Sequence, residues 1–379
     1  MKICYLNRAK QVYFSRWYDF FVKRGHEVHV ISGDVSHIDV DIEMPPGVKV
    51  HYLSEKKIVK NQMLNFGYNM IRLPIIMKEL RDLIKQISPD IIHAHAITPN
   101  GFWGALSGFH PFIVTPTGSD AIVFTRKYPF YGLIAEHVFK SADIITSDSM
   151  VLNEAIFEFG GEPSKTYSIQ NGVDLTLFNT RVDKSKIRAE LNIGSAPVIF
   201  SSRGTKPIYN IDCVIKAIPM MLKVFPDAKF LFCYNGLQMV DKLKRMADRL
   251  GVAESTMFLG FVKYQDMPFY QAAADINISV PSTDSSPASV YESMACGVPV
   301  IVSDLQWTKH FIRNRGNALI VPPRDPEAIA DSILEILQNK NLKNRLIEGG
   351  LSIVKQHIDY HKNMEMMERL MEKLVTQKG

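Results

Sequence analysis

The stretch PSTDSSPASVYESMACGVPVIVSD, residues 281–304, decides the fold of this chain. The run PVIVS after Gly297 is rich in β-branched residues and predicts a buried strand. Gly297 stands where a glycine commonly follows the end of a helix. A helix of about two turns is therefore expected between Ser289 and Cys296, as one unit of an α/β protein.

The start of this predicted helix suits a diphosphate group. Small residues stand at its start, namely Ser286, Pro287, Ala288 and Ser289. The bare N–H groups of the first helical turn and the helix dipole favour an anion there. Glu292 lies one turn inside the helix, too deep to cap it, where its carboxylate can accept hydrogen bonds from ribose hydroxyls. The alternative for Glu292 is an exposed helix carboxylate without a ligand.

Composition limits the class of protein. A chain of 379 residues with 46% hydrophobic and 22% charged residues predicts two folded α/β domains. No apolar run is long enough to span a membrane, and the first residues lack a signal peptide pattern. Four scattered cysteines indicate a reducing, cytoplasmic compartment. The net charge of +5 is too small and dispersed to indicate a nucleic-acid partner.

Strand and helix patterns alternate in two series, which predicts two doubly wound parallel sheets of the Rossmann type. A polar segment with turn signals places a domain boundary near residues 180–195, and residues 351–378 predict a long Met-rich helix. The expected strands are 2–6, 27–32, 91–96, 112–117 and 143–148 in the first series, and 196–203, 228–236, 255–262, 276–282, 299–304 and 318–323 in the second.

An acidic residue, Asp284, precedes Glu292 by eight positions inside a block that reads E-(S/A)-M-A-x-G-x-P-V-(I/V). This block resembles the nucleotide-sugar site of the retaining glycosyltransferases of family 4, and the resemblance covers nearly the whole chain. It implies the GT-B fold, in which two Rossmann-like domains face a central cleft. Residues 1–185 would then form the acceptor domain, joined by a crossover helix at about 355–379, and residues 186–354 the donor domain.

The resemblance also implies roles for charged residues. Arg203 would clamp the donor diphosphate, and a second cation usually follows it in a Lys-Gly pair. Here Tyr209 and Asn210 stand at that place, so Lys206, the nearest cation, becomes the candidate for the second clamp, with a solvated loop lysine as the alternative. Asp284 stands where the family usually has Glu near the transferred sugar; alternatively it caps a turn.

Further loops are implied to border the ligands. Phe261 and Val262 would line the base, and Gly236 would lie in a turn near the donor; each could equally be an ordinary strand-end turn. Main-chain contacts do not identify the base, so UDP, GDP and ADP remain open. Asp120 would orient an acceptor hydroxyl or cap the next helix, beside Thr117, where the family often has His.

Two further patterns have competing interpretations. His93 and His95 fall on one face of a strand without a third ligand, which favours a packed pair over a metal site, and the DxD at residues 39–41 is read as chance. Residues 56–87 carry seven basic and two acidic residues among large apolar ones, which predicts either contact with an anionic membrane or a core-facing helix.

The predicted function is a retaining, metal-independent glycosyltransferase of polysaccharide or O-antigen biosynthesis. It would move a sugar from a nucleoside-diphosphate sugar to a glycan or lipid-linked acceptor, with no separate cofactor, in the cytoplasm or at the inner face of the membrane. The alternatives are a nucleotide-sugar epimerase of the same fold and an inactive nucleotide-sugar-binding scaffold.

Overall fold

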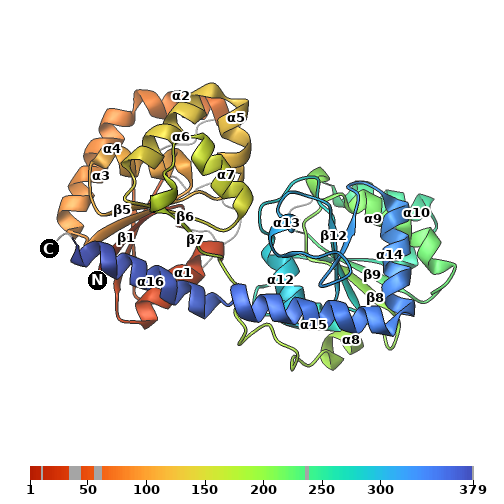
Figure 1. Ribbon diagram of the computed structural model, residues 1–379. Helices are drawn as coiled ribbons and strands as arrows, with labels where there is room; N and C mark the ends of the chain where they lie inside the picture. The colour runs from red at the N-terminus through yellow and green to blue at the C-terminus, as the bar shows by residue number, and fades with distance from the viewer. Residues whose placement is uncertain (10–11, 34–43, 55–61, 235–238, 378–379) are drawn as a thin grey trace. The chain divides into compact units, whose positions relative to one another are not determined.

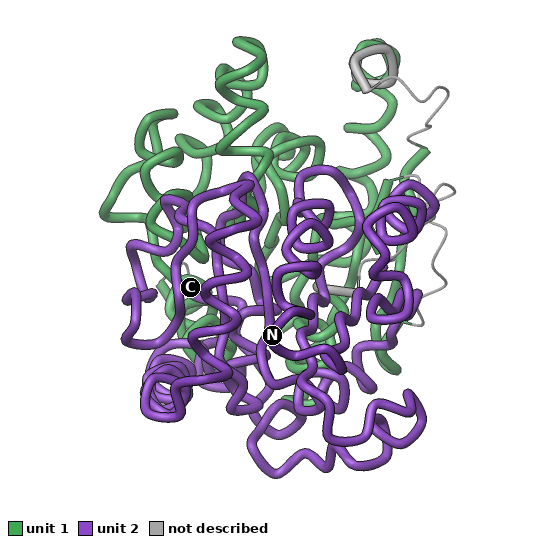
Figure 2. The backbone as a smooth tube through the Cα atoms, turned by 90° about the vertical axis from the view of Figure 1, so that its right-hand side faces the viewer, with its two compact units in different colours: residues 1–169, 364–379 green, residues 170–363 purple. Residues whose placement is uncertain are grey.

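The computed structural model describes residues 1–9, 12–33, 44–54, 62–234 and 239–377. The chain divides into two compact units, coloured separately in Figure 2. Unit 1 holds Met1–Ile169 and Met364–Gly379, and unit 2 holds Gln170–Asn363. The sequence predicts the boundary between the two units near residues 180–195, later than the division after Ile169. It predicts that the chain returns to unit 1 at about residue 355, earlier than Met364.

Unit 1 is built on a seven-stranded parallel sheet in the order β3-β2-β1-β4-β5-β6-β7 (Figure 1). This is a doubly wound order, as the sequence predicts. The strands are β1 Lys2–Leu6, β2 Glu27–Ser32, β3 Val48–Tyr52, β4 Ile91–His95, β5 Phe112–Thr115, β6 Ile144–Ser147 and β7 Thr166–Ser168. The helices are α1 Val12–Lys23, α2 Gln62–Ile71, α3 Leu73–Ile87, α4 Phe102–Ser107, α5 Thr125–Lys127, α6 Pro129–Ser141 and α7 Met150–Glu158, with single turns η1 Ile97–Gly101, η2 Asp120–Phe124 and η3 Pro163–Lys165.

Unit 2 repeats the plan with six parallel strands in the order β10-β9-β8-β11-β12-β13. The strands are β8 Val198–Ser201, β9 Lys229–Cys233, β10 Thr256–Gly260, β11 Ile276–Ser279, β12 Val300–Ser303 and β13 Leu319–Val321. The helices are α8 Ser185–Glu190, α9 Ile211–Leu222, α10 Val240–Arg249, α11 Met267–Ala273, α12 Ala288–Ala295, α13 Thr308–Phe311, α14 Pro326–Gln338 and α15 Lys340–His357, with turns η4 Pro207–Tyr209 and η5 Ala253–Ser255.

Central strands of both sheets are buried along their whole length. Every residue of β4, β8, β11 and β12 is buried, because helices cover both faces of a parallel sheet. The edge strands β3 and β7, which the sequence analysis did not identify, are only partly buried. Their short, mixed sequences VKVHY and TYS therefore carry little apolar signal.

The stretch 351–378 is largely helical, as expected, but it is divided between two helices, α15 and α16 Tyr360–Thr376, separated at Ile358. The break is held by the loop at Val173, whose N–H donates to the carbonyl of Ile358 at 2.7 Å. The N–H of Tyr360 donates back to the carbonyl of Val173 at 3.0 Å. Gly172, with φ +72°, lets the backbones meet, since a Cβ there would lie 2.5 Å from the Cα of Tyr360.

Helix α16, dark blue in Figure 1, packs its last turns into unit 1. Met364, Met367 and Met371 are fully buried on one helical face. The buried carboxylate of Glu368 pairs with Arg24 at 2.8 Å and with His26 at 2.7 Å. Burial raises the pKa of Glu368, but the hydrogen bonds from these two residues outweigh it and leave the pKa lowered.

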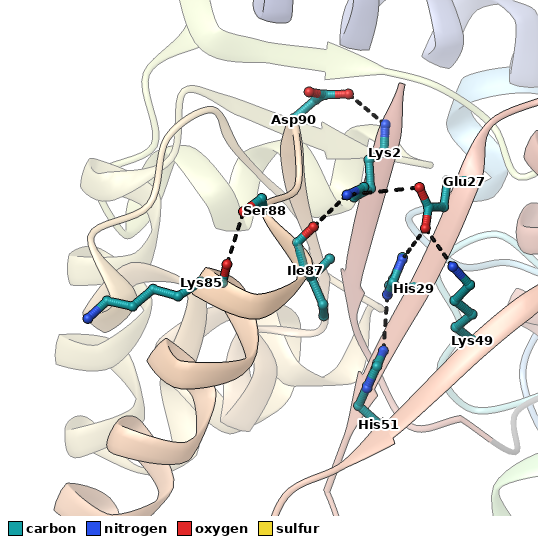
Figure 3. A network of polar contacts seen from close by, with 9 residues as sticks. All are labelled: Lys2, Glu27, His29, Lys49, His51, Lys85, Ile87, Ser88 and Asp90. Atoms are coloured by element: carbon teal, nitrogen blue, oxygen red, sulfur yellow. Dashed lines mark hydrogen bonds and ion pairs between the residues drawn. The ribbon is translucent and has the colours of Figure 1, made fainter.

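A polar network holds strands β1, β2 and β3 together near their amino ends (Figure 3). Glu27 accepts from Lys49 at 2.6 Å and pairs with His29 at 3.0 Å, while His29 contacts His51 at 3.0 Å. The Lys49 and His29 hydrogen bonds lower the pKa of Glu27 to about 2. Lys2 and Glu27 are the first residues of their strands. In this architecture ligands bind at the carboxyl ends of the strands, so the network lies at the opposite end of the sheet.

Within the described residues, none of the helices combines the length and apolar character that crossing a bilayer requires.

Candidate functional site

The residues predicted to bind a donor gather at the carboxyl ends of the strands of unit 2. Arg203 follows β8, and Asp284 follows β11, the neighbouring strand. Helix α12 begins four residues after Asp284. Because parallel strands end at one edge of the sheet, these segments meet although about 80 residues separate them.

Arg203 and Asp284 form an ion pair. Nη2 of Arg203 lies 2.7 Å from Oδ2 of Asp284, and the two side chains are only 16% and 14% exposed. Burial raises the pKa of Asp284, and the Arg203 charge opposes that shift. The second oxygen, Oδ1, accepts from the backbone N–H of Ser285 at 2.9 Å. The carboxylate thus holds a cation with one oxygen and the backbone N–H of the next residue with the other, which is not the bond of a turn cap.

The guanidinium of Arg203 has two further neighbours. Nη1 lies 3.4 Å from Oγ of Ser289, the second residue of α12. The Tyr209 ring lies against the guanidinium, with its centroid 4.7 Å from the Arg203 Cζ atom. The sequence analysis did not assign a role to Tyr209, because a cation–π contact leaves no pattern in the sequence.

Helix α12 starts without a side-chain cap, at an N-cap formed by Pro287. It covers Ala288–Ala295, against the expected Ser289–Cys296, so the helix is confirmed with its ends one residue earlier. Gly297 has φ +73°, and its N–H donates to the carbonyl of Met294 at 3.0 Å, which confirms the expected glycine stop. The first N–H groups of a helix without a side-chain cap can bind an anion.

Glu292 is 8% exposed, which rules out the exposed-carboxylate alternative. Cys296 follows the last residue of this helix; burial raises the pKa of its thiol to about 12, and the Glu292 charge adds to the shift. One turn before the helix, the hydroxyl of Ser286 donates to Oε1 of Gln170 at 3.0 Å. Gln170 is a further polar residue at this edge that sequence reasoning missed.

Lys206 is exposed and precedes the turn η4. In the described part of the chain, its ammonium group has neither an ion-pair partner nor a hydrogen-bond partner. Its carbonyl accepts from the N–H of Tyr209 at 2.9 Å. The side chain is thus free to reach a ligand but is not held in place.

Asn210 is fully buried and adopts φ +52°, a backbone conformation that suits the glycine expected from the family pattern. Nδ2 donates to the carbonyl of Val280 and to Oγ of Ser282, both at 2.9 Å. Oδ1 accepts from Nη1 of Arg324 at 2.7 Å. The side chain therefore ties together the loops after β8, β11 and β13.

The loop after β10 presents Phe261, which is 55% exposed, followed by the half-buried Val262. Both positions suit a wall beside a ligand or an ordinary turn. The N–H of Tyr234 donates to the carbonyl of Gly260 at 3.0 Å and joins this loop to the end of β9. Gly236, the predicted turn near the donor, lies outside the described residues.

In unit 1, Asp120 is buried and joins the loops that follow β4 and β5. Its carboxylate accepts from the backbone N–H groups of Ile97 at 2.8 Å, Thr117 at 2.9 Å and Ala121 at 3.1 Å. Burial raises the pKa of Asp120, and these three bonds oppose the shift. The geometry matches the capping alternative, and a role in orienting an acceptor stays a prediction.

His93 and His95 are fully buried on one face of β4. Nε2 of His93 lies 2.6 Å from Oγ1 of Thr115, and Nδ1 of His95 lies 3.1 Å from Nδ2 of Asn7. The His95 ring stacks on Phe14 at 4.0 Å. In the part of the chain that the structure describes, no three His, Cys, Asp or Glu side chains are grouped to hold a metal ion. The pair is packed, as the sequence favours; residues 39–41 lie outside the described part.

The basic stretch 56–87 has features of both interpretations, the core-facing helix and the contact with an anionic membrane. Helix α3 turns Ile76, Met77, Leu80, Ile84 and Ile87 into the core, which is the core-facing alternative. Ile71 and Ile75 remain exposed at 82% and 53%. Residues 56–61 lie outside the described part.

Two family models match the chain. The family described as "Glycosyl transferases group 1" matches residues 183–352, which lie within unit 2. The family described as "Glycosyl transferase 4-like" matches residues 2–149, within unit 1. Each unit thus matches a family of its own, and the candidate donor residues all fall in the first match.

The curated relatives carry glycosyltransferase names. A "GDP-mannose-dependent monoacylated alpha-(1-6)-phosphatidylinositol monomannoside mannosyltransferase" of Corynebacterium glutamicum is 29% identical over 223 residues, 56% of each chain. An "N-acetyl-alpha-D-glucosaminyl L-malate synthase" of Bacillus anthracis is 21% identical over 354 residues, 92% of this chain and 89% of the relative. With the relatives it matches first, the chain spans only 50%, 56% and 63% of their length.

Solved structures share the fold at low sequence identity. Alr3699/HepE of Anabaena, solved in complex with UDP-glucose, has a TM-score of 0.79 and 18% identity, over 99% of this chain and 100% of that one. At this identity the likeness establishes the architecture of two parallel-sheet α/β units.

Proposed function

The chain belongs to the group 1 glycosyltransferases and has their GT-B fold, and from this premise we propose that it transfers a sugar from a nucleoside-diphosphate sugar to a glycan or lipid-linked acceptor. The observation that carries the proposal is the cluster at the start of α12. There a paired arginine, a helix N-terminus without a side-chain cap and a buried glutamate lie along one sheet edge. These groups suit a diphosphate followed by a ribose.

In the proposed reaction, the bond between the anomeric carbon and the diphosphate oxygen breaks while the acceptor oxygen bonds to the same carbon. Negative charge develops on the leaving diphosphate, where Arg203 and the N–H groups of α12 stabilise it. Lys206, exposed and unpaired in the described part, supplies the second cation. The acceptor proton passes to a diphosphate oxygen, so that the step needs neither a metal ion nor a cofactor.

Retention of the anomeric configuration is part of the proposal. Its support is the resemblance of residues 281–304 to the retaining family. Asp284 lies beside the transferred sugar in this scheme, where its ion pair with Arg203 opposes the rise in pKa that burial causes. Asp120 would act through the loops it joins, which border the acceptor side.

Two comparisons point to different bases for the donor nucleotide. One relative is named GDP-mannose-dependent, and one structural neighbour was solved with UDP-glucose. UDP, GDP and ADP are therefore titrated calorimetrically into the wild type, Glu292→Ala and Glu292→Gln. We expect one nucleotide to bind. Loss of the charged hydrogen bonds from Glu292 to the ribose should weaken binding by about 1.5–3 kcal/mol in Glu292→Ala, and by less in Glu292→Gln, whose amide oxygen still accepts.

Glu292→Gln is the matched control, since it keeps the shape of the buried side chain and removes its charge. Binding of the same nucleotide with equal strength to all three proteins would contradict the assignment of Glu292 to the ribose. Failure of all three nucleotides to bind the wild type would contradict the proposed donor site as a whole.

The two alternatives differ in what they do with a bound donor. An epimerase releases or interconverts the nucleotide sugar without an acceptor, and a scaffold binds it without turnover. Incubation of the wild type with the preferred nucleotide sugar, with and without acceptor glycans, separates them. Release of nucleoside diphosphate that depends on the acceptor is expected.

Contact with an anionic membrane is proposed for the acceptor side. Its support is the strong exposure of Ile71 and Ile75 beside the basic segment. Pelleting with vesicles that contain phosphatidylserine tests it: recovery equal to that with neutral vesicles would contradict it.

A further inference from the structure

Tyr209 is wedged between the core of unit 2 and the Arg203 guanidinium. Its side chain packs against the hydrophobic core, and its ring lies 3.5 Å from the position a Cβ would take on Gly204. The ring also lies against the guanidinium of Arg203, whose Cζ is 4.7 Å from the ring centroid. The ring is therefore fixed by packing and can serve as a support for a cation.

Three elements restrain Arg203 at once. Asp284 pairs with Nη2, Ser289 lies beside Nη1, and Tyr209 supports the guanidinium. A guanidinium carries five N–H donors, of which the ion pair with Asp284 uses one and the contact with Ser289 a second. The side chain is only 16% exposed, and cation–π attraction is stronger where water is partly excluded. Arg203 is thus held in one orientation with donors to spare.

We propose that Tyr209 is the positioning residue that holds Arg203 ready for the donor diphosphate. This inference rests on the proposed function of the site. Ordering a long, flexible side chain costs conformational entropy on binding, and a side chain ordered beforehand avoids most of that cost. At the position where the family resemblance implies a lysine, this chain has Tyr209, whose ring lies against the guanidinium of Arg203.

If Tyr209 positions Arg203 through its ring, binding of the diphosphate needs the aromatic face of Tyr209 and does not need its phenol hydroxyl. Tyr209→Phe keeps the face, whereas Tyr209→Leu keeps apolar packing and removes the face. The probes are inorganic pyrophosphate, whichever of UDP, GDP and ADP binds the wild type, and the matching nucleoside without phosphate. The nucleoside reports on the base and ribose contacts alone.

We expect Tyr209→Phe to bind all three probes within about twofold of the wild type. Tyr209→Leu should lose roughly 3- to 30-fold in affinity for the nucleoside diphosphate and for pyrophosphate. Its affinity for the nucleoside should stay unchanged. Rescue by phenylalanine and the split between probes with and without phosphate are results that a general packing role would not produce. If Tyr209→Leu does not fold, as judged by its thermal transition, Tyr209→Met replaces it.

Two results would overturn the inference and leave the donor site standing. One is nucleoside diphosphate affinity in the leucine variant equal to that of the wild type. The other is an equal loss for the nucleoside and the diphosphate. Absence of all binding to the wild type would instead overturn the donor site, and the role of Tyr209 with it.

Discussion

His93 and His95 are two titratable rings held inside unit 1 without access to water. Burial lowers the pKa of His93 to about 3 and that of His95 well below its usual value, with the neighbouring His93 adding to the second shift. Both rings are therefore neutral in the folded state near pH 6, where histidines of the unfolded chain gain a proton. The unfolded state binds more protons, so stability must fall as the pH drops from about 6.5 towards 3.

We expect each histidine to remove about 2 kcal/mol of unfolding free energy between pH 7 and pH 5. Urea unfolding of His95→Asn, compared with the wild type over this range, measures the effect. The asparagine can still accept from Asn7 but cannot take up a proton. Unfolding of the variant should therefore take up close to one proton fewer than unfolding of the wild type, and its unfolding free energy should change less with pH. Parallel pH curves for the two proteins would show that His95 is already accessible to protons in the folded state.

The sequence predicts individual site residues best where topology alone decides their position. The resemblance assigns Arg203 and Asp284 to one site, and each follows a strand of the same parallel sheet, but their ion pair is seen only in the structure. The support of Arg203 by Tyr209 could not be predicted, because it depends on how a single turn of backbone lays a ring against a guanidinium. The assignment of Lys206 as a second clamp remains a prediction, since its exposed side chain has no fixed position.

At the scale of elements, the junction of α15 and α16 depends on one glycine. Gly172 has φ +72°, and an added Cβ would lie 2.5 Å from the Cα and 2.7 Å from the N of Tyr360. Neither backbone atom can rotate away as a flexible side chain would. Gly172→Ala should therefore cost at least about 3 kcal/mol of unfolding free energy, since strain of the left-handed conformation alone costs about 1–2.

Gly251→Ala is the matched control for this variant. Gly251 has φ +69° and no atom within 4 Å of the added Cβ, so it should show the conformational strain without the clash. Chemical unfolding of both variants gives the comparison. Equal destabilisation would mean that the loop at Gly172 moves aside and does not hold the junction.

Helices and buried strands were predicted well because each shows a clear apolar pattern, as β8 and β12 do. The break at Ile358 was missed because apolar periodicity continues across it and no Pro or Gly stops the helix there. The break is imposed by pairing with Val173, nearly 190 residues away in sequence. Contacts of that range are not visible in a local pattern.

At the scale of the whole molecule, the two units are joined by the chain twice, at residues 169/170 and 363/364. The composition shift near residues 180–195 marks a polar loop. The division of the chain into two units depends instead on which hydrophobic core each residue packs into. The loop around Val173 packs against Ile358 and Tyr360, which places it in unit 2. A boundary drawn from composition alone therefore lies too late.

Removal of the residues after Asn363 should destabilise unit 1 and spare unit 2. The truncation takes away three buried methionines, Met364, Met367 and Met371, with Glu368. Burial of a methionine contributes about 1.5–3 kcal/mol, so the loss from unit 1 should approach roughly 5–9 kcal/mol as an upper estimate. Calorimetry should show one thermal transition lowered or lost.

A chain truncated after Lys373 serves as the control, because it retains all four of these side chains. Its unfolding should differ little from that of the full chain. Two unchanged transitions after removal from Met364 onwards would mean that α16 contributes nothing to the core of unit 1.

The return of α16 to unit 1 has a consequence for synthesis on the ribosome. The unit that begins to emerge first cannot be completed until residue 371 is made, whereas unit 2 has all its residues by position 363. At about 5–20 residues per second, the roughly 200 residues between Ile169 and Met371 take roughly 10–40 s. During that interval the apolar surface destined for the three methionines stays uncovered on the nascent chain. The order of completion is thus the reverse of the order of translation.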